Sequence, residues 1–336
     1  MIQSAIQRVE SGHDLSLDEV VETFDQIMGG GCPEDDIARW LLALNRKGPS
    51  VSEVAGAATA LRRKMTPIRS SRPELLDTCG TGGDRLHTFN ISTASALVTA
   101  AAGVPVAKHG NRAASSHSGS ADVLAVLGVN VEAGVDCVER CLDELGICFC
   151  FAPLLHNAMK HVAPVRKKLG VPTIFNILGP LINPAGASRQ LLGVGRAELR
   201  PLLAEALVLL GTVRSMVVHG SDGLDEVTLT GSTDVAEAAG QVRHFQWTPA
   251  DFGLGNIDLK SIQVSGSDQS AATIRGVLAG RPGPARDIVV ANAAAALWTA
   301  GAVPSPAAGA VLAAEVIDTA AASDLLARLV ARSHGK

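Results

Sequence analysis

The sequence predicts an α/β protein that has a small N-terminal helical domain and a larger domain with a mainly parallel sheet flanked by helices. The first 65 residues carry only helical patterns. From residue 75 onward, short apolar runs alternate with helical segments, and this alternation is typical of a parallel sheet covered on both faces. With 336 residues, 47% of them hydrophobic, the chain is long enough for one large domain and one smaller one.

The helical domain is expected over residues 1–70, and its helices begin at recognisable signals. Residues 16–19 and 50–53 both read as capping boxes, in which Ser and Glu satisfy each other's backbone N–H groups. Three glycines at 29–31 end the first of these helices, and Pro33 starts the next. The apolar stripes exceed what four short helices need to pack together, which indicates that a partner covers part of this surface.

The larger domain is expected over residues 71–336, except that the Pro-rich stretch interrupts it and about 160–185 return to the helical domain. The predicted strands are 75–78, 104–107, 147–151, 191–194 and 215–219, and the predicted helices between them are 94–102, 119–128, 134–145 and 198–211. Ligands of such folds bind at the carboxyl ends of the strands. The loops at 80–84, 108–116 and 220–226 each follow a predicted strand, so we expect all three at one rim.

Composition excludes several classes of function. The net charge of −4 gives no basic field for nucleic acid, and the 3% of aromatic residues, with no Tyr, disfavours a base-stacking surface. The N-terminus lacks the apolar core of a signal peptide, and the uncharged stretch 288–314 is interrupted by Asn and Pro, so it predicts buried helices rather than a membrane span. We therefore expect neither a nucleic-acid nor a membrane partner.

The six cysteines form no CxxC pair. A zinc site that includes His156 is conceivable, but buried free thiols are favoured, since a zinc site needs closely spaced ligands. Sparse and unpatterned cysteines in a long chain predict a cytoplasmic protein.

Residues 79–93 form the most informative stretch, CGTGGDRLHTFNIST. Its glycines let the backbone approach a ligand closely, and Asn90, Ser92 and Thr93 stand where a helix would begin. Free N–H groups and the positive end of that helix would then face an oxyanion, most often phosphate. The alternative is a glycine-rich turn with an ordinary helix cap.

A second loop, KHGNRAASSHSGS at 108–120, strengthens the phosphate interpretation. Two fixed cations, Lys108 and Arg112, share it with Asn111 and four serines. Lysine offers phosphate a point charge, arginine offers a planar fork, and hydroxyl groups add neutral donors. Two such loops predict a ligand with more than one phosphate, whereas a merely solvated loop would leave its small residues unexplained.

Two further positions are candidates for ligand binding. Asp225 and Glu226 are adjacent carboxylates behind a glycine turn, and magnesium prefers a few carboxylates together with phosphate oxygens and water. Acid pairs beside turns are also common on surfaces. Arg166 could bind a carboxylate through its guanidinium group, or it could be a surface residue beside Lys167 and Lys168.

These motifs, in this order, resemble the anthranilate phosphoribosyltransferases. The resemblance rests on GTGGD-x3-TFNIST, KHGNRAASS-x-SGSADVL, HNAMKHVAPVR, TIFNILGPLINP and VVHG followed by DEV, and it runs over nearly the whole chain. It implies a nucleoside phosphorylase/phosphoribosyltransferase-like fold. It also implies transfer of the phosphoribosyl group of 5-phosphoribosyl 1-pyrophosphate to the amine of anthranilate, with release of pyrophosphate, in tryptophan biosynthesis. Two magnesium ions per monomer and a homodimer through the helical domain follow from the same resemblance.

The resemblance also implies roles for individual residues. The positions that match the lining of the donor site are Gly80, Gly83, Asp84, Thr88, Asn90, Ile91, Ser92, Thr93, Lys108, His109, Gly110, Asn111, Arg112, Ala113, Ala114, Ser115, Ser116 and Ser120. Gly80, Asn111 and Arg166 match the anthranilate contacts. Ser92, Asp225 and Glu226 match the magnesium ligands, whereas Asp222 is not included.

No residue is expected to be an essential acid or base. Lys108, Asn111 and Arg112 are expected to position the donor and stabilise charge. His109 is expected to be a positioning donor rather than a base, because the amine becomes acidic only after the C–N bond has formed. Arg85, His117 and the pair 154–155 depart from the usual family pattern, which affects loop details and donor affinity.

Two alternatives remain at this point. A pyrimidine nucleoside phosphorylase has a similar fold but would use inorganic phosphate and a nucleoside. A non-catalytic nucleic-acid-binding branch of the fold would need a basic groove and degraded magnesium ligands, whereas this chain has a net charge of −4 and an intact acid pair.

Overall fold

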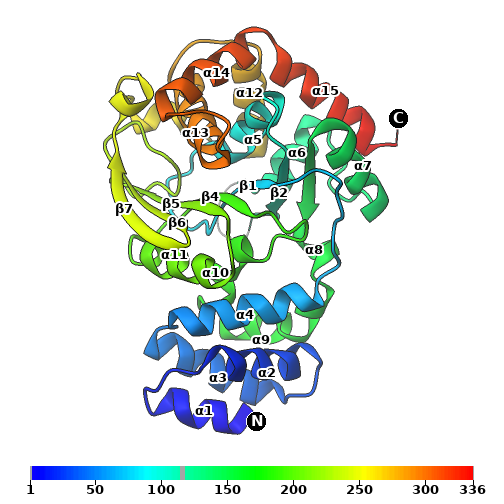
Figure 1. The fold of residues 1–336 in the computed structure, drawn as a ribbon. Coiled ribbons are helices and arrows are strands. Elements are labelled where there is room, and N and C mark those ends of the chain that lie inside the picture. Colours follow the sequence, from blue (N-terminus) through cyan, green and yellow to red (C-terminus); the bar gives the residue numbers. More distant parts are fainter. Residues whose placement is uncertain (1, 114–117, 336) are drawn as a thin grey trace.

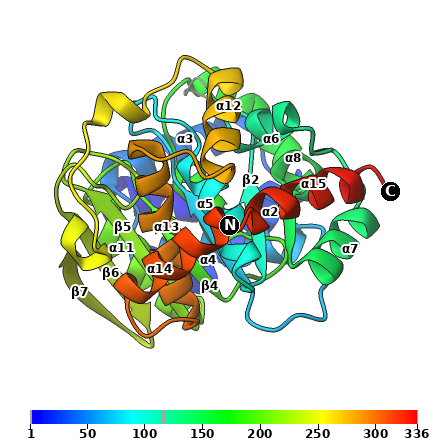
Figure 2. The ribbon, with the colours of Figure 1, turned by 90° about the horizontal axis from the view of Figure 1, so that it is seen from above.

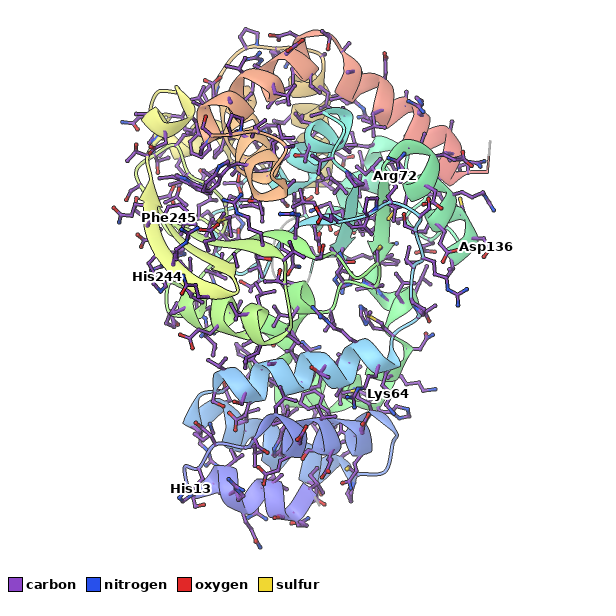
Figure 3. All side chains as sticks on the ribbon, viewed as in Figure 1. His13, Lys64, Arg72, Asp136, His244 and Phe245 are labelled. Atoms are coloured by element: carbon purple, nitrogen blue, oxygen red, sulfur yellow. The ribbon has the colours of Figure 1, made fainter. Side chains whose placement is uncertain are left out.

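A computed structural model describes residues 2–113 and 118–335 of the chain. The N-terminal helices form a bundle beneath a larger sheet domain, and the chain leaves the bundle after Lys64 at the end of the fourth helix (Figures 1 and 3). The bundle consists of α1 (Ile2–Glu10), α2 (Leu17–Met28), α3 (Glu34–Lys47) and α4 (Val51–Lys64). The boundary proposed at residue 70 stays a prediction.

Both predicted capping boxes are present. The Ser16 hydroxyl accepts a hydrogen bond from the Glu19 N–H at 3.3 Å, and the Glu19 carboxylate accepts one from the Ser16 N–H at 2.8 Å. Ser50 and Glu53 form the same pair at the start of α4. Glu53 is fully buried and also accepts from the Leu15 N–H, so this cap ties two helices together.

The larger domain contains a seven-stranded sheet in the order β3-β2-β1-β4-β5-β6-β7. Five strands are parallel and correspond to the five predicted ones, which confirms the fold class; β6 and β7 form an antiparallel hairpin that was not predicted. The strands are β1 (Leu76–Gly80), β2 (Val106–Gly110), β3 (Ile147–Phe151), β4 (Arg189–Gly193), β5 (Arg214–Gly220), β6 (Thr233–Ala239) and β7 (Gln241–Trp247). The hairpin was missed because β6 is rich in Ala and Asp/Glu, residues of low strand propensity.

Helices cover both faces of the sheet. The views from the side and from above place α5 and α13 over one face, with α12, α14 and α15 further out (Figures 1 and 2). Apart from those between β3 and β4, the helices of this domain are α5 (Ile91–Ala101), α6 (Ser120–Leu127), α7 (Val135–Leu145), α11 (Leu199–Leu209), α12 (Ser267–Leu278), α13 (Pro284–Ala300), α14 (Pro306–Asp318) and α15 (Ala321–Ser333), with the 3₁₀ turns η3 (Pro249–Phe252) and η4 (Leu259–Ile262). None of the described helices is long and apolar enough to span a membrane.

The opposite face of the sheet shares its core with the helical bundle. α11 packs against β5, β6 and β7 on one side and against α4 on the other. As a result, Phe24 of the bundle, Leu203 of α11 and Val217 of β5 belong to one continuous apolar cluster. The bundle is therefore anchored to the sheet by a hydrophobic core and not only by its covalent connections.

The connection after β3 runs down to the bundle and back. It consists of α8 (Ala152–Leu155), η1 (Asn157–His161), α9 (Ala163–Leu169), α10 (Phe175–Leu178) and η2 (Gly179–Leu181), and is called the connecting segment below. α9 packs against α3, and α10 packs against α4. Hydrogen bonds join it to the bundle as well: Arg62 Nε donates to the Leu181 carbonyl at 2.7 Å, and the Thr66 N–H donates to the Leu155 carbonyl at 2.8 Å.

Candidate active site

The loops that follow β1 and β5 meet over the carboxyl end of β4. A Cβ atom at Gly193 would lie 1.6 Å from the Asp225 carbonyl oxygen, and one at Gly195 would lie 2.9 Å from the Asp84 backbone nitrogen. Glycine is therefore required at both positions for the two loops to approach each other. Sequence reasoning missed both residues, although a short Gly-x-Gly follows a predicted strand there.

Three carboxylates gather at this meeting point. The Asp225 side chain shares a hydrogen bond with Asp84, and Glu226 accepts one from the Ser92 N–H at 3.0 Å. Burial raises the pKa of Asp225 well above its usual range, and the charges of Asp84 and Glu226 raise it further. Burial also raises the pKa of Glu226 to about 7, against the opposing effect of Lys108. Clustered carboxylates with raised pKa values form a site that favours a cation.

This cluster fits magnesium better than a metal held by protein alone. In the described ranges, no group of three or more His, Cys, Asp or Glu side chains is arranged to hold a metal ion by itself. Magnesium, however, commonly takes only one or two carboxylates and completes its octahedron with water and substrate oxygens. The Ser92 hydroxyl, at the start of α5, offers a further oxygen atom beside Glu226.

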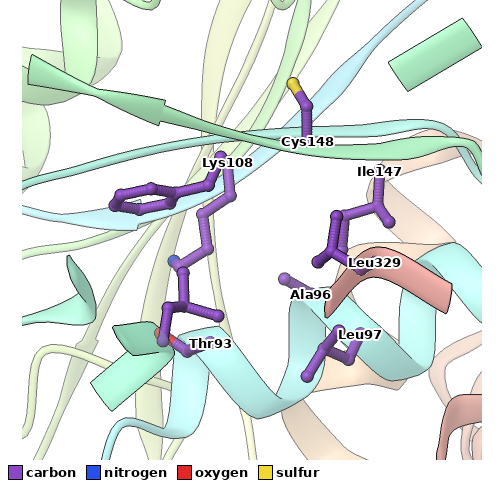
Figure 4. A pocket seen from close by; sticks show the side chains of 9 residues that line it. Thr93, Ala96, Leu97, Lys108, Ile147, Cys148 and Leu329 are labelled. Atoms are coloured by element: carbon purple, nitrogen blue, oxygen red, sulfur yellow. The ribbon is translucent and has the colours of Figure 1, made fainter. Parts of the chain in front are cut away.

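Lys108 lies below the rim, on β2. Its ammonium group donates to the Thr78 carbonyl and, at 3.3 Å, to the Ser92 hydroxyl. Figure 4 shows its side chain extending from the strand toward the first turn of α5, where Thr93 lies. Burial lowers the pKa of this lysine, whereas the carboxylates of Asp77 and Glu226 raise it. The cation therefore lies next to the first turn of α5.

Asn90 stands at the N-cap position of α5, as predicted, but its side chain does not cap the helix. Its amide oxygen instead accepts hydrogen bonds from the hydroxyls of Ser118 and Ser270, both at 2.8 Å. Ile91 is the first residue of the helix and is buried. Asn90 thus ties the end of the second loop and the start of α12 to the first turn of α5.

The second loop is described only in part, since the predicted donor residues Ala114, Ser115 and Ser116, together with His117, lie outside the described residues. Before this gap, Gly110 allows the close approach of Ser120, whose hydroxyl would lie 2.1 Å from a Cβ at that position.

Arg112, also in this loop, is already paired. It forms ion pairs with Asp122 at 3.3 Å and Glu132 at 2.9 Å, and its guanidinium lies 5.5 Å from the Phe151 ring centre. Asn111 accepts from the Arg112 N–H, and the Ala113 N–H donates to Asp122. Arg112 would therefore have to leave these carboxylates in order to bind a phosphate.

The remaining predicted donor residues belong to the first loop. Gly83 has a positive φ of 88°, which glycine adopts readily, and Arg85, the departure from the family pattern, adopts a φ of 61°. Thr88 forms an isolated bridge with Gln263, which holds the end of the loop against the segment after η4. Asp222, which was excluded as a ligand, accepts from the Thr228 hydroxyl at 2.7 Å and shapes its own turn.

Beneath the rim, buried Asp77 joins both phosphate loops to the connecting segment. It accepts from the His109 N–H at 3.1 Å and from Asn183 Nδ2 at 2.8 Å, and Asn183 Nδ2 also donates to the Ala107 carbonyl at 2.7 Å. Sequence reasoning did not identify Asp77 or Asn183 as part of the site, because their partners lie far away in the chain.

His109 and His156 form a buried pair whose proton positions follow from their partners. His109 Nδ1 lies 3.0 Å from the Gly179 carbonyl, which can only accept, so Nδ1 carries the proton. His109 Nε2 is then an acceptor for the Nε2–H of His156 at 3.1 Å. Burial lowers the pKa of His109 to about 3 and that of His156 to about 4. Both rings are therefore neutral, and His109 has no free lone pair with which to act as a base.

This pair also bears on the zinc alternative. His156 uses Nε2 to bind His109, and all six cysteines are free. Cys148 and Cys150 lie on β3 with their sulfur atoms 3.8 Å apart, and both are buried. Free thiols were therefore predicted correctly, but Cys32 and Cys137 are only partly buried, unlike the other four.

Arg166, on α9, has no acidic partner in the part of the chain that the structure describes. Its guanidinium lies 5.2 Å from the centre of the Phe175 ring. Partial burial lowers its pKa. A desolvated guanidinium whose donors are not used by a carboxylate is suited to bind an external anion.

Comparison with known proteins agrees with this architecture. Residues 72–323 match the "Glycosyl transferase family, a/b domain" model, and residues 3–65 match the helical bundle domain of the same family. The fold and the site thus define a two-domain glycosyl transferase.

Comparison with full-length relatives identifies the family within this class of transferases. The chain belongs to the anthranilate phosphoribosyltransferase family. It is 50% identical over 336 residues to the anthranilate phosphoribosyltransferase of Anaeromyxobacter sp. (strain Fw109-5), which covers 100% of this chain and 99% of that relative. It is 52% identical over 331 residues to that of Rhodospirillum rubrum, covering 98% and 95% of the two chains.

Solved structures of the family superpose closely. The enzyme from Thermus thermophilus has a TM-score of 0.93 at 44% identity, covering 98% of this chain and 99% of that one. The Saccharomyces cerevisiae enzyme in complex with PRPP and Mg has a TM-score of 0.91 at 28% identity, covering 100% and 98%. These likenesses favour the transferase over the nucleoside phosphorylase alternative.

The neutral histidine pair predicts a specific pH dependence of stability. Below pH 6.5 the unfolded chain binds protons at both histidines, but the folded chain does not until the pH approaches 4, so the free energy of unfolding falls as pH falls. His156→Gln keeps an N–H donor for His109 and removes one titrating group. Between pH 6 and 4.5, urea unfolding should show that the wild type loses about 1.4 kcal/mol per pH unit more than the variant. Parallel pH profiles for the two proteins would contradict the assignment of neutral rings.

Proposed function

We propose that the two parts of this site divide between them the reaction of the family, which transfers the phosphoribosyl group of 5-phosphoribosyl 1-pyrophosphate to the amine of anthranilate. The observation that carries the proposal is the arrangement of charge. Carboxylates, a buried lysine and a helix N-terminus meet at the strand ends, whereas a partly buried arginine with no acidic partner among the described residues lies on the connecting segment. The first group suits a phosphorylated donor with metal, and the second suits an acceptor carboxylate.

The donor is proposed to lie across the two phosphate loops. Its lining would consist of the residues predicted from the sequence between Gly80 and Ser120. Lys108 supports this placement, because its ammonium group lies beside Ser92 at the positive end of α5 and so adds a fixed charge to the helix dipole. Arg112 would contribute only after exchanging its carboxylate partners for phosphate.

Magnesium is proposed to bind at Ser92, Asp225 and Glu226, with two ions per chain when the donor is present. The Saccharomyces cerevisiae structure in complex with PRPP and Mg supports the use of this metal. When bound, the metal neutralises the charge that develops on the departing pyrophosphate. The raised pKa values of both carboxylates agree with this role, since a divalent cation relieves their repulsion.

Anthranilate is proposed to place its carboxylate on Arg166, with Gly80 and Asn111 as further contacts. A Saccharomyces cerevisiae homologue in complex with 4-fluoroanthranilate, 27% identical with a TM-score of 0.89, supports an acceptor of this type. The amine nitrogen attacks C1 of the ribose, the C1–O bond breaks, and pyrophosphate leaves with the bonding electrons. The nitrogen loses its proton after the C–N bond has formed, so no strong base is required, and neutral His109 keeps its hydrogen bonds.

A homodimer through the helical bundle is proposed as the assembly. Its support is a groove of about 340 Å³ between α3 and α9, in which the apolar side chains of Ala38, Leu42, Val165 and Leu169 lie beside the charged Glu34, Asp35 and Lys168. Leu42 is 37% exposed there although it is a large apolar residue.

The six free cysteines suit the reducing cytoplasm, where we place the protein.

The metal proposal predicts the behaviour of a double variant. Asp225→Asn with Glu226→Gln should abolish magnesium-dependent turnover without lowering the unfolding midpoint, because the amides have nearly the same shape and remove the repulsion between the clustered carboxylates. The lost compensation of leaving-group charge should cost several kcal/mol in barrier. Turnover is measured by the loss of anthranilate fluorescence. Asp222→Asn, in the neighbouring turn, is the control and should retain magnesium dependence; near-normal turnover in the double variant would place the metal elsewhere.

A second prediction separates the two substrates. Arg166→Ala removes a charge-assisted contact worth about 1.5–3 kcal/mol, so it should weaken anthranilate roughly ten- to a hundredfold and leave donor affinity within about twofold. Lys108→Ala should show the opposite pattern. Titration of each variant with each ligand measures both effects. Equal weakening of both ligands by Arg166→Ala would show that the acceptor site has been misplaced.

The dimer prediction is tested at the groove. Leu42→Asp places a charge among its apolar lining residues and should shift the mass measured by light scattering at micromolar concentration from dimer to monomer. Leu154→Asp alters another exposed leucine, 44% exposed but on the connecting segment, and should leave the mass unchanged. A monomeric wild type would refute the assembly itself.

A further inference from the structure

The guanidinium of Arg166 rests on the end of an aromatic cluster that reaches into the helical bundle. It lies 5.2 Å from the ring centre of Phe175, and Phe175 packs against Phe24 with ring centres 5.5 Å apart. Phe24 in turn meets Trp40 edge to face, at 5.3 Å and 81°. Phe24 and Trp40 are completely buried, and Phe175 is 7% exposed. The ring under Arg166 is therefore fixed by the core of a different domain from the one that carries the strand-end loops.

An arginine that must bind an external carboxylate faces two conflicting requirements. Its long side chain needs to be held in one orientation, because ordering it on binding costs affinity. An acidic partner would hold it, but that partner would also occupy the N–H groups and cancel the charge that the ligand needs. Arg112 shows this arrangement, since Asp122 and Glu132 occupy its guanidinium.

An aromatic ring meets both requirements. It attracts the face of the guanidinium through the ring quadrupole, and it leaves the N–H donors at the edge of the group free. The ring itself has to be rigid. It belongs to the short helix α10, which packs against α4 and whose Asn176 side chain accepts a hydrogen bond from the Thr173 N–H at 2.9 Å. Partial burial also strips water from the guanidinium, which strengthens both interactions.

We propose that Phe175 is a positioning residue for the acceptor, which orients the Arg166 guanidinium so that its donor edge is free for the carboxylate. The proposal rests on the role of Arg166 proposed above. Phe175 would act only through Arg166 and make no contact with the reacting atoms. Loss of the ring should therefore raise KM for anthranilate and leave KM for the donor and the rate at saturating acceptor nearly unchanged.

The test compares substitutions at two positions of the same cluster. Phe175→Leu removes the ring and keeps an apolar side chain, and KM for anthranilate should rise about three- to thirtyfold, the range expected for loss of a partly desolvated cation–π contact. Phe175→Tyr retains a ring and should restore most of the affinity. Phe24→Leu removes the adjacent ring but leaves Phe175 beneath Arg166, so it should lower the melting temperature at least as much as Phe175→Leu while raising KM for anthranilate much less.

The outcomes separate this proposal from the one on which it rests. If Arg166→Ala leaves KM for anthranilate unchanged, the acceptor site itself is misplaced. If Arg166→Ala raises that KM and Phe175→Leu does not, Arg166 binds the acceptor without help from the ring, and the positioning role is wrong. An equal rise in KM for anthranilate in Phe24→Leu and Phe175→Leu would show that the effect comes from general packing, and it would also overturn the positioning role of Phe175. Phe175→Met, which is longer and more flexible, replaces Phe175→Leu in each comparison if the leucine variant does not fold.

Discussion

The three carboxylates at the carboxyl end of the sheet are the constraint on which the rest of the structure depends. Asp84, Asp225 and Glu226 are drawn together although burial and mutual repulsion raise the pKa values of the latter two. Such an arrangement is unfavourable by itself, so it persists only where the surrounding backbone fixes it. The backbone does so through contacts that tolerate no side chain at Gly193 and Gly195, and through the start of α5, where Ser92 donates to Glu226. A divalent cation at the proposed metal site would relieve this repulsion.

The two cations that are proposed to bind the substrates, Lys108 and Arg166, are held in different ways, and the difference suits the ligand proposed for each. Lys108 is embedded among a carbonyl, a hydroxyl and nearby carboxylates, which suits a point charge that acts over a short distance at a helix end. Arg166 has no acidic neighbour in the described structure and lies on an aromatic ring. The lysine is thus fixed among charged and polar groups, whereas the arginine is held by an aromatic ring and has no acidic partner among the described residues.

The sequence predicted the fold more completely than it predicted the site. The five parallel strands were found because each is a short apolar run between helical patterns, and the rule that ligands bind at strand ends brought residues 80–84 and 220–226 together before any coordinates. The assignments of individual binding residues remain predictions. Three features could not be found: Gly193 matters only because of an atom from residue 225, His109 is satisfied by a histidine 47 positions away, and Arg112 is paired with one acid from α6 and one from the turn that follows it. Each depends on contacts between distant segments, which motif patterns do not record.

The course of the connecting segment explains why the helical bundle belongs to the site and is more than an attachment. The segment carries His156, Arg166 and Asn183, and each is fixed by a different part of the molecule: His156 by β2, Arg166 by a ring packed in the bundle, and Asn183 by Asp77 at the centre of the sheet. The position of the acceptor side relative to the strand ends is therefore set by how the bundle sits on the sheet. That placement is determined by the shared core between α4 and α11, in which bundle and sheet residues form one apolar cluster. Because a close-packed core resists sliding, the distance between the two proposed substrate sites is set by hydrophobic packing on the face of the sheet opposite to α5 and α13.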